Sequence, residues 1–142
     1  MSTHDAPFKT PIAVIAHAHP TISKGGAEIA AWTLFAGLRG LGIPAVFIAA
    51  VPYDQRDGFD PRPDEYPVYY DAAQYDHFYQ LSAPEVSRQL CATICRTDAH
   101  LLIFHHFLHF GLNGCGTRQC SPAGMAFWCC TSSSPSATTM AR

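Results

Sequence analysis

Residues that could bind an anion lie together between two apolar stretches of the chain. The segment Thr21–Glu28 reads Thr-Ile-Ser-Lys-Gly-Gly-Ala-Glu, and helical periodicity follows it. If Gly25 is the N-cap of that helix, its first amides are free to bind an anion, with Lys24 beside them. Gly26 would let a ligand approach the backbone, and Glu28 would lie where the helix dipole favours a carboxylate. The alternative is structural: the glycines only form the turn and Glu28 only caps the helix.

Five histidines form two further groups with chemical potential. His17 and His19 follow an apolar run, and alternation would point them to the same side if that run continues as a strand. His105, His106 and His109 lie in His-His-Phe-Leu-His-Phe-Gly, where a helix would place the first and third on one face, able to hold a metal. No acidic residue nearby could orient such ligands, so we expect no metal site. The histidines could line one crevice, or could be polar residues where the chain meets water.

The elements that must position these residues follow from hydrophobic periodicity. Pro11–Ala18 is a short apolar, β-branched run, which predicts a strand buried on both faces. Ala27–Gly40 has apolar residues at helical spacing, and Gly40 with Gly42 supplies its end. Pro44–Val51 predicts a second buried strand. The three together predict a right-handed βαβ unit.

The remainder of the first 113 residues is more varied. Pro52–Tyr70 is rich in proline, acidic residues and tyrosine, which predicts a loop or insertion with little regular structure. Ser82 and Glu85 form a capping box. The other predicted elements are a short helix, the helix that this box opens and a third buried strand: Ala72–Leu81, Ala83–Arg96 and His100–His105. We therefore predict an α/β, Rossmann-like parallel sheet with flanking helices, whose ligands bind beyond the carboxyl ends of the strands.

Composition limits the function classes. The chain has 142 residues, a net charge of −2, 48% apolar residues and 14% charged residues, which suits one domain and predicts no nucleic-acid partner. The longest apolar stretches are too short or interrupted for a transmembrane segment. Residues 1–10 lack the apolar core of a secretory signal. We expect a cytoplasmic protein.

Several motifs between Pro11 and Asn113 are similar to those of a known family. The order of strand, Gly-Gly-Ala-Glu turn, helix ending in Leu-Arg-Gly-Leu-Gly and second strand resembles the N-terminal domain of family 4 glycosyltransferases, which have the two-domain GT-B fold. Two later stretches look like a bacterial subgroup of that family. The motifs that carry the resemblance are Gly25–Glu28, Leu38–Gly42, Phe78–Ser82 and Phe104–Asn113.

The resemblance implies sugar transfer from a nucleotide-sugar donor to an acceptor with retention of configuration. It implies no metal and no cofactor other than that donor. The N-terminal domain of the family mainly receives the acceptor, whereas a C-terminal domain holds the nucleotide and contributes paired glutamates. By the same resemblance, Lys24, Gly25, Gly26 and Glu28 would line the cleft near the donor phosphates. Helix amides and cations there would stabilise the charge that develops on the leaving diphosphate.

Residues 114–142 differ sharply from what precedes them. They hold four of the six cysteines and no histidine or acidic residue. The family would have a strand ending in a Leu-His-Glu motif here. If the third base of each codon is read with the first two of the next, Trp128–Cys129 must give Val, Cys129–Cys130 must give Leu and Met140–Ala141 must give Gly. These residues match the motif in register, which predicts that the segment is read out of frame.

We therefore expect two parts: residues 1–113, a partial acceptor-side domain forming an incomplete half of a GT-B fold, and residues 114–142, a tail without regular structure. Such a chain would lack transferase activity. Two alternatives stay open. One is a small Rossmann-like module that binds a nucleotide or another anion at Gly25 and Gly26. The other, weaker, is a metal-binding protein that uses His105, His106 and His109.

Overall fold

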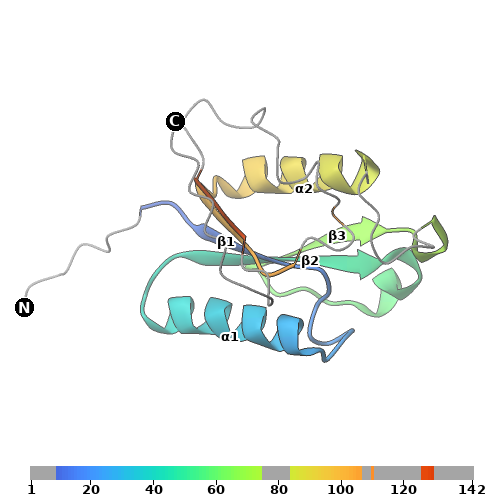
Figure 1. Cartoon of the computed structure of the whole chain (residues 1–142), viewed down its shortest axis with the longest axis horizontal. Coiled ribbons are helices and arrows are strands. Elements are labelled where there is room, and N and C mark those ends of the chain that lie inside the picture. The colour runs from blue at the N-terminus through green and yellow to red at the C-terminus, as the bar shows by residue number, and fades with distance from the viewer. Residues whose placement is uncertain (1–8, 75–83, 107–109, 111–125, 130–142) are drawn as a thin grey trace, which may run out of the picture.

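A fully parallel β-sheet organises the chain (Figure 1). The computed structural model describes residues 9–74, 84–106, 110 and 126–129, and the last four only as backbone. These residues form a five-stranded sheet of order β3-β2-β1-β4-β5. Its strands are β1 Ile12–Ala16, β2 Ala45–Pro52, β3 Glu65–Tyr70, β4 Leu101–Phe104 and β5 Ala126–Cys129. The predicted α/β, Rossmann-like fold is confirmed.

Strand β1 is the most enclosed element of the sheet. All five of its residues are buried, and parallel ladders flank it on both edges, with Ile12 opposite Ala45 of β2 and Leu101 of β4. A strand covered on both faces needs no polar alternation, which explains its unbroken apolar sequence. Strand β2 is buried along its whole length for the same reason.

Two helices cover opposite faces of the sheet, as Figure 1 shows. Helix α1, Gly26–Gly40, packs Ala31 and Phe35 against strand residues such as Val14 and Phe47. Helix α2, Pro84–Thr97, buries Val86, Leu90 and Ile94 with the strand residues of opposite parity, among them Ile15, Ile48 and Phe104. Strand alternation thus divides the core into two layers. Neither helix, in the part of the chain that is described, has the length and apolar character that a membrane crossing requires.

The end of α1 agrees with the prediction from its glycines. The helix ends at Gly40, Leu41 is its C-cap, and Gly42 adopts a left-handed φ of 75°. The amide of Gly42 donates to the carbonyl of Arg39, and that of Ile43 donates to the carbonyl of Leu38, both at 3.0 Å. This pair of hydrogen bonds is the Schellman motif, which turns the chain directly into β2.

The prediction of an irregular loop over Pro52–Tyr70 is wrong. A 3-10 helix, η1, spans Tyr53–Gly58, and β3 spans Glu65–Tyr70. Valine and tyrosines favour a strand, and Pro67 is tolerated because β3 lies at the sheet edge, where a missing amide donor costs no ladder bond. Proline and acidic residues in the linker to β3 concealed the strand from a reading of composition.

Other predicted boundaries need smaller corrections. Strand β4 is shorter than His100–His105, and its burial alternates along its length. The predicted helix Ala72–Leu81 is a 3-10 turn over Ala72–Gln74, named η2, before the described part is interrupted. Ser82 of the predicted capping box lies outside the described residues.

Within the tail, Ala126–Cys129 forms regular structure that the sequence did not predict. This backbone forms β5, which pairs in parallel with β4 from Leu101 opposite Ala126 to Phe104 opposite Cys129. The sequence Ala-Phe-Trp-Cys is apolar and aromatic, so it has strand propensity whatever its origin. Pairing also covers the edge of β4 that would otherwise present unpaired backbone groups.

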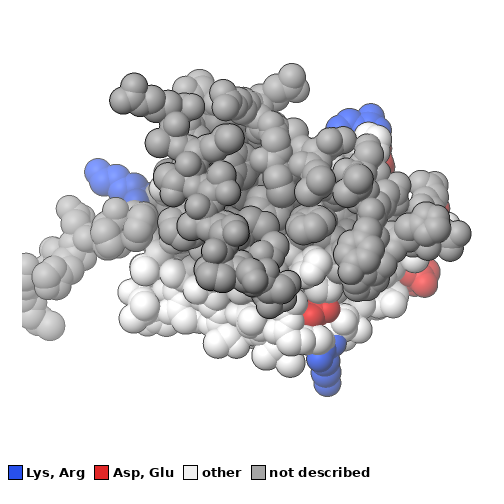
Figure 2. Space-filling view, viewed as in Figure 1, with Lys and Arg blue, Asp and Glu red and all other residues white. Residues whose placement is uncertain are grey.

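The exposed face of α1 is nearly uncharged, and Figure 2 shows this as a broad white area. The charged residues of this helix are Glu28, which is buried, and Arg39, which forms an ion pair of 2.8 Å with Asp64. That pair connects the end of α1 to the segment before β3. The connection helps to hold this segment close to the helix.

The side chain of Gln89 hydrogen-bonds to the backbone of β3 at the outer edge of the sheet. The side-chain amide of Gln89 accepts a hydrogen bond from the backbone amide of Tyr69 and donates one to its carbonyl, both at 3.0 Å. Gln89→Ala should therefore lower the free energy of unfolding by about 1 to 3 kcal/mol, since each bond contributes roughly 0.5 to 1.5 kcal/mol. Urea unfolding measures this loss.

The matched control is Arg88, the residue that precedes Gln89 in α2. Arg88→Ala removes an exposed ion pair of 2.6 Å with Glu85, so its effect should stay within about 1 kcal/mol. Equal losses in the two variants would contradict the assigned role of Gln89.

Candidate functional site

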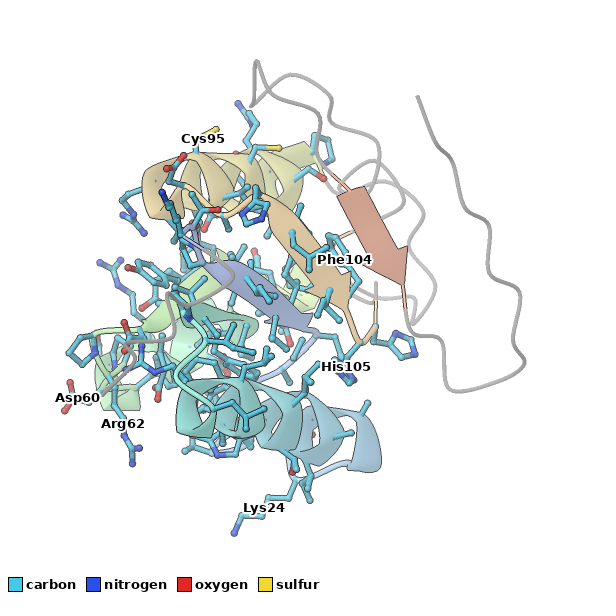
Figure 3. The ribbon with its side chains drawn as sticks, turned by 90° about the vertical axis from the view of Figure 1, so that its left-hand side faces the viewer. Lys24, Asp60, Arg62, Cys95, Phe104 and His105 are labelled. Atoms are coloured by element: carbon cyan, nitrogen blue, oxygen red, sulfur yellow. The ribbon has the colours of Figure 1, made fainter. Side chains whose placement is uncertain are left out.

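The polar residues singled out from the sequence gather where the strand order reverses. Strands β2 and β3 lie on one side of β1, whereas β4 and β5 lie on the other. In open parallel sheets such a switch point creates a crevice beyond the carboxyl ends of the strands. His17 follows β1, His105 and His106 follow β4, and the start of α1 faces the same edge of the sheet. Figure 3 shows His105 at the end of β4 on the side of α1.

His17 contacts a residue at the start of α1 and another after β4. Its Nε2 lies 3.1 Å from Oε1 of Glu28, and both side chains are largely shielded, with 16% and 4% exposed. Its ring also meets the ring of His106 edge-on, with centroids 5.0 Å apart. Burial lowers the pKa of His17 more than Glu28 raises it, and His106 lowers it further. Burial also lowers the pKa of His105. The lowered pKa values favour the neutral imidazole at His17 and at His105.

The start of α1 has the predicted cap with an unexpected neighbour. Gly25 is the N-cap, in an extended conformation, and its carbonyl accepts the amide of Ile29 at 3.1 Å. The carboxylate of Glu28 folds back over it, so closely that a Cβ at position 25 would collide with Oε2. A Cβ on Gly26 would meet nothing within 4 Å. A side chain at position 25 would therefore displace the Glu28 carboxylate from this place.

This arrangement changes the electrostatics expected for an anion site. The Glu28 carboxylate already lies at the positive end of the α1 dipole, so an incoming phosphate would be repelled by it. A cation must offset this repulsion. Lys24 is the cation closest in sequence, and its side chain extends outward from the turn (Figure 3).

His19 lies apart from His17. The strand ends at Ala16, so the condition for the expected alternation is not met and the alternation does not extend to these residues. His19 is 3% exposed and packs edge-on against Trp32, Phe47 and Phe59. It borders a cavity of about 570 Å³ on the α1 side of the sheet. The cavity is lined by His19, Pro20, Thr21, Lys24, Trp32, Gly58, Phe59, Asp60, Arg62 and Glu65.

The hydrogen bonds of His19 assign its tautomer. The backbone amide of Thr21 donates to Nδ1 at 3.2 Å, so Nδ1 carries no proton in the neutral ring. The proton is then on Nε2, which lies 3.4 Å from Oε2 of Glu65. Burial lowers the pKa of His19, although the Glu65 charge opposes this. The amide of Arg62 donates to the same carboxylate oxygen at 3.2 Å.

Glu65 is the site residue that sequence reasoning missed. It is 7% exposed and opens β3, inside the segment taken for a loop. A signal was available: a carboxylate directly before the run Tyr-Pro-Val-Tyr-Tyr. Recognising the edge strand would have placed this carboxylate on the sheet.

The metal alternative finds no support in the part of the chain that the structure describes. There, no three histidine, cysteine, aspartate or glutamate side chains come together in a way that could hold a metal ion. His105 and His106 are described, whereas His109 lies outside the described residues. Comparison of the chain with models of protein families and with curated proteins finds no match in either case.

The lowered histidine pKa values predict how stability depends on pH. In the unfolded chain His17, His19 and His105 have a pKa near 6.5, and in the folded chain their pKa values are lower. As the pH falls through 6.5, the unfolded chain therefore binds more protons than the folded chain. The free energy of unfolding should be highest above this pH and fall below it, by at most about 1.4 kcal/mol per pH unit for each histidine.

Urea unfolding at about pH 7.5 and about pH 5.5 measures this dependence. His105→Gln should make the difference between the two values smaller, because one of the three linked groups is lost. A free energy of unfolding that is equal at the two pH values, or higher at the lower one, would contradict the assignment of buried neutral imidazoles.

Proposed function

We propose that the chain is a glycosyltransferase family 4-like N-terminal domain, the acceptor side of a GT-B enzyme. Enzymes of this kind transfer a sugar from a nucleotide-sugar donor to an acceptor with retention of configuration. The proposal rests on the motifs of Gly25–Glu28 and Phe104–Asn113 together with their location. Much of the second motif lies outside the described residues, so its support comes from sequence.

One observation carries the proposal: the glycine turn and the histidines meet at the switch point of a parallel sheet. His17, which follows β1, contacts both Glu28 of α1 and His106, which follows β4. A Rossmann-like sheet uses this crevice for its ligand, and a glycine turn leaves the backbone accessible. The arrangement suits a ligand that lies across the ends of β1 and β4.

The charge of each residue determines the role that we assign to it. We assign the donor diphosphate to Lys24 and the amides that follow Gly25, because a leaving diphosphate gains negative charge. Glu28 is a positioning residue: its Oε1 holds His17, and because its Oε2 lies over Gly25, the diphosphate needs Lys24 to offset this charge. In this family a second domain supplies the nucleotide pocket and the catalytic glutamates, so we expect the chain alone to bind the diphosphate weakly and to transfer no sugar.

Ligand titration tests this assignment. Adding UDP to the isotope-labelled chain should shift the amide signals of Gly25 and Gly26, with a dissociation constant of about 1 mM or weaker. Lys24→Ala should weaken binding several-fold. Lys9→Ala removes the same charge before β1, at the opposite edge of the sheet, and should leave binding unchanged.

The same titration separates the proposal from its main alternative. Inorganic pyrophosphate that binds as well as UDP would favour a small anion-binding module over a nucleotide-sugar site. No shift at Gly25 and Gly26 with either ligand, or an equal effect of Lys9→Ala and Lys24→Ala, would contradict both.

The tail is proposed to be the out-of-frame product of a sequence that once continued the domain. The gene, read in the shifted frame from about the codon of Gly114, should encode a strand ending in Leu-His-Glu and then a domain with paired glutamates. Nucleotide sequencing of the locus gives the answer. A shifted frame that is interrupted by stop codons before the Leu-His-Glu motif would contradict this proposal and leave the site assignments standing.

A further inference from the structure

The cavity beside His19 contains a hydroxyl in contact with a buried histidine. Oγ1 of Thr21, an exposed residue, lies 2.7 Å from Nδ1 of His19. On the other side of the ring, Nε2 lies 3.4 Å from the buried carboxylate of Glu65. Hydroxyl, imidazole and carboxylate thus stand in sequence along the wall of the cavity.

The direction of the proton follows from the tautomer. Because Nδ1 accepts the amide of Thr21, it also accepts the hydroxyl proton of the same residue, and Glu65 faces the proton on Nε2. A hydroxyl that donates to an imidazole backed by a carboxylate is the arrangement that activates serine and threonine nucleophiles. Burial lowers the pKa of His19, which favours the neutral form that can accept a proton.

We propose that Thr21 is a nucleophile, activated by His19 and Glu65, that accepts an acyl group from a neutral ester bound in this cavity. The site lies off the switch point and goes beyond the proposed glycosyltransferase function. A volume of about 570 Å³ lies within the range of small-molecule pockets.

The lining of the cavity selects the class of electrophile. Lys24 and Arg62 balance Asp60 and Glu65, so the formal charge of the lining is zero when all four are ionised. A phosphoanhydride would gain no net attraction there, whereas a neutral ester loses nothing on entry. Trp32 and Phe59 offer an apolar wall, which favours an ester with an aromatic or apolar part. Asp60, Arg62 and Lys24 all extend toward solvent at its rim (Figure 3).

The step balances within these groups. Thr21 Oγ1 forms a bond to the carbonyl carbon while its proton passes to Nδ1 of His19. The bond from that carbon to the leaving oxygen breaks, its electron pair stays on the oxygen, and His19 returns the proton to it. Oε2 of Glu65, 3.4 Å from Nε2, lies beside the positive charge that His19 gains during the step. The products are an ester of Thr21 and a free alcohol, and water can later cleave the ester by the reverse route.

The probe is p-nitrophenyl acetate, added to the full chain. We expect a stoichiometric burst of p-nitrophenolate and, by mass spectrometry, one acetyl group on the peptide that contains Thr21. The rate should rise with pH as His19 becomes deprotonated. Thr21→Val removes the attacking oxygen and should abolish the burst, whereas Thr21→Ser keeps a hydroxyl and should retain it.

A matched control keeps the test specific. Thr33 is also exposed, but its hydroxyl donates to the Ile29 carbonyl within α1, so Thr33→Val should leave the burst unchanged. Glu65→Gln should slow the burst and flatten its pH profile. Circular dichroism verifies that each variant is folded.

Three results would overturn the proposal: a burst of equal size in Thr21→Val, acetyl groups only on lysine or His19, or no burst in the folded chain. Each would mean that the contact between Thr21 and His19 serves only to stabilise the turn. UDP binding would be unaffected by any of them, so this failure is distinguishable from failure of the proposed function.

Discussion

The enclosure of β1 is the constraint on which the rest of the structure depends. Its five residues are shielded on both faces and bonded along both edges, so none of them can carry a polar side chain without a large desolvation cost. Polar residues can begin only where the strand ends. His17 is the first such residue, and the strand order brings β4 and the start of α1 to the same place. The location of the candidate site is therefore a consequence of how the core is packed.

Two buried histidine–glutamate pairs then hold the turn between β1 and α1. His17 pairs with Glu28 inside the turn's own helix, and His19 pairs with Glu65 from β3. Burying charges is costly, so such pairs persist when each member is hydrogen-bonded or when its partner remains neutral. Neutral imidazoles beside the carboxylates reduce that cost. The turn is thereby attached both to the helix that follows it and to the distant edge strand.

Local sequence signals were sufficient where local physics decides the structure. The uninterrupted apolar run of β1, the helical spacing of α1 and the left-handed Gly42 were all predictable from neighbouring residues. Local signals failed where a partner far along the chain decides whether a segment forms a strand. Strand β3 needs β2 to its side and Gln89 to complete its edge, and β5 needs β4. Amino-acid composition reveals none of these partners.

The candidate site was predictable in its location more than in its contacts. Histidines at the ends of two parallel strands had to lie near one edge of the sheet, but the separation of His17 from His19 required knowing that β1 stops at Ala16. Glu65 could not be paired with His19 while its strand was taken for a loop. Long-range pairs of titratable groups depend on chain reversal, which periodicity does not encode.

The same short turn creates two different electrostatic environments. On the side of the helix start, the folded-back Glu28 carboxylate offsets the dipole of α1, so a ligand there must bring its charge close to a cation such as Lys24. On the side of the cavity, cations and carboxylates balance, and a buried base faces a hydroxyl. Lys24 borders both environments, so the two ligands differ in the other groups that face them: Glu28 at the helix start, and His19 with Glu65 in the cavity. This difference arises because the chain reverses at once after β1, which directs His17 and His19 to different neighbours.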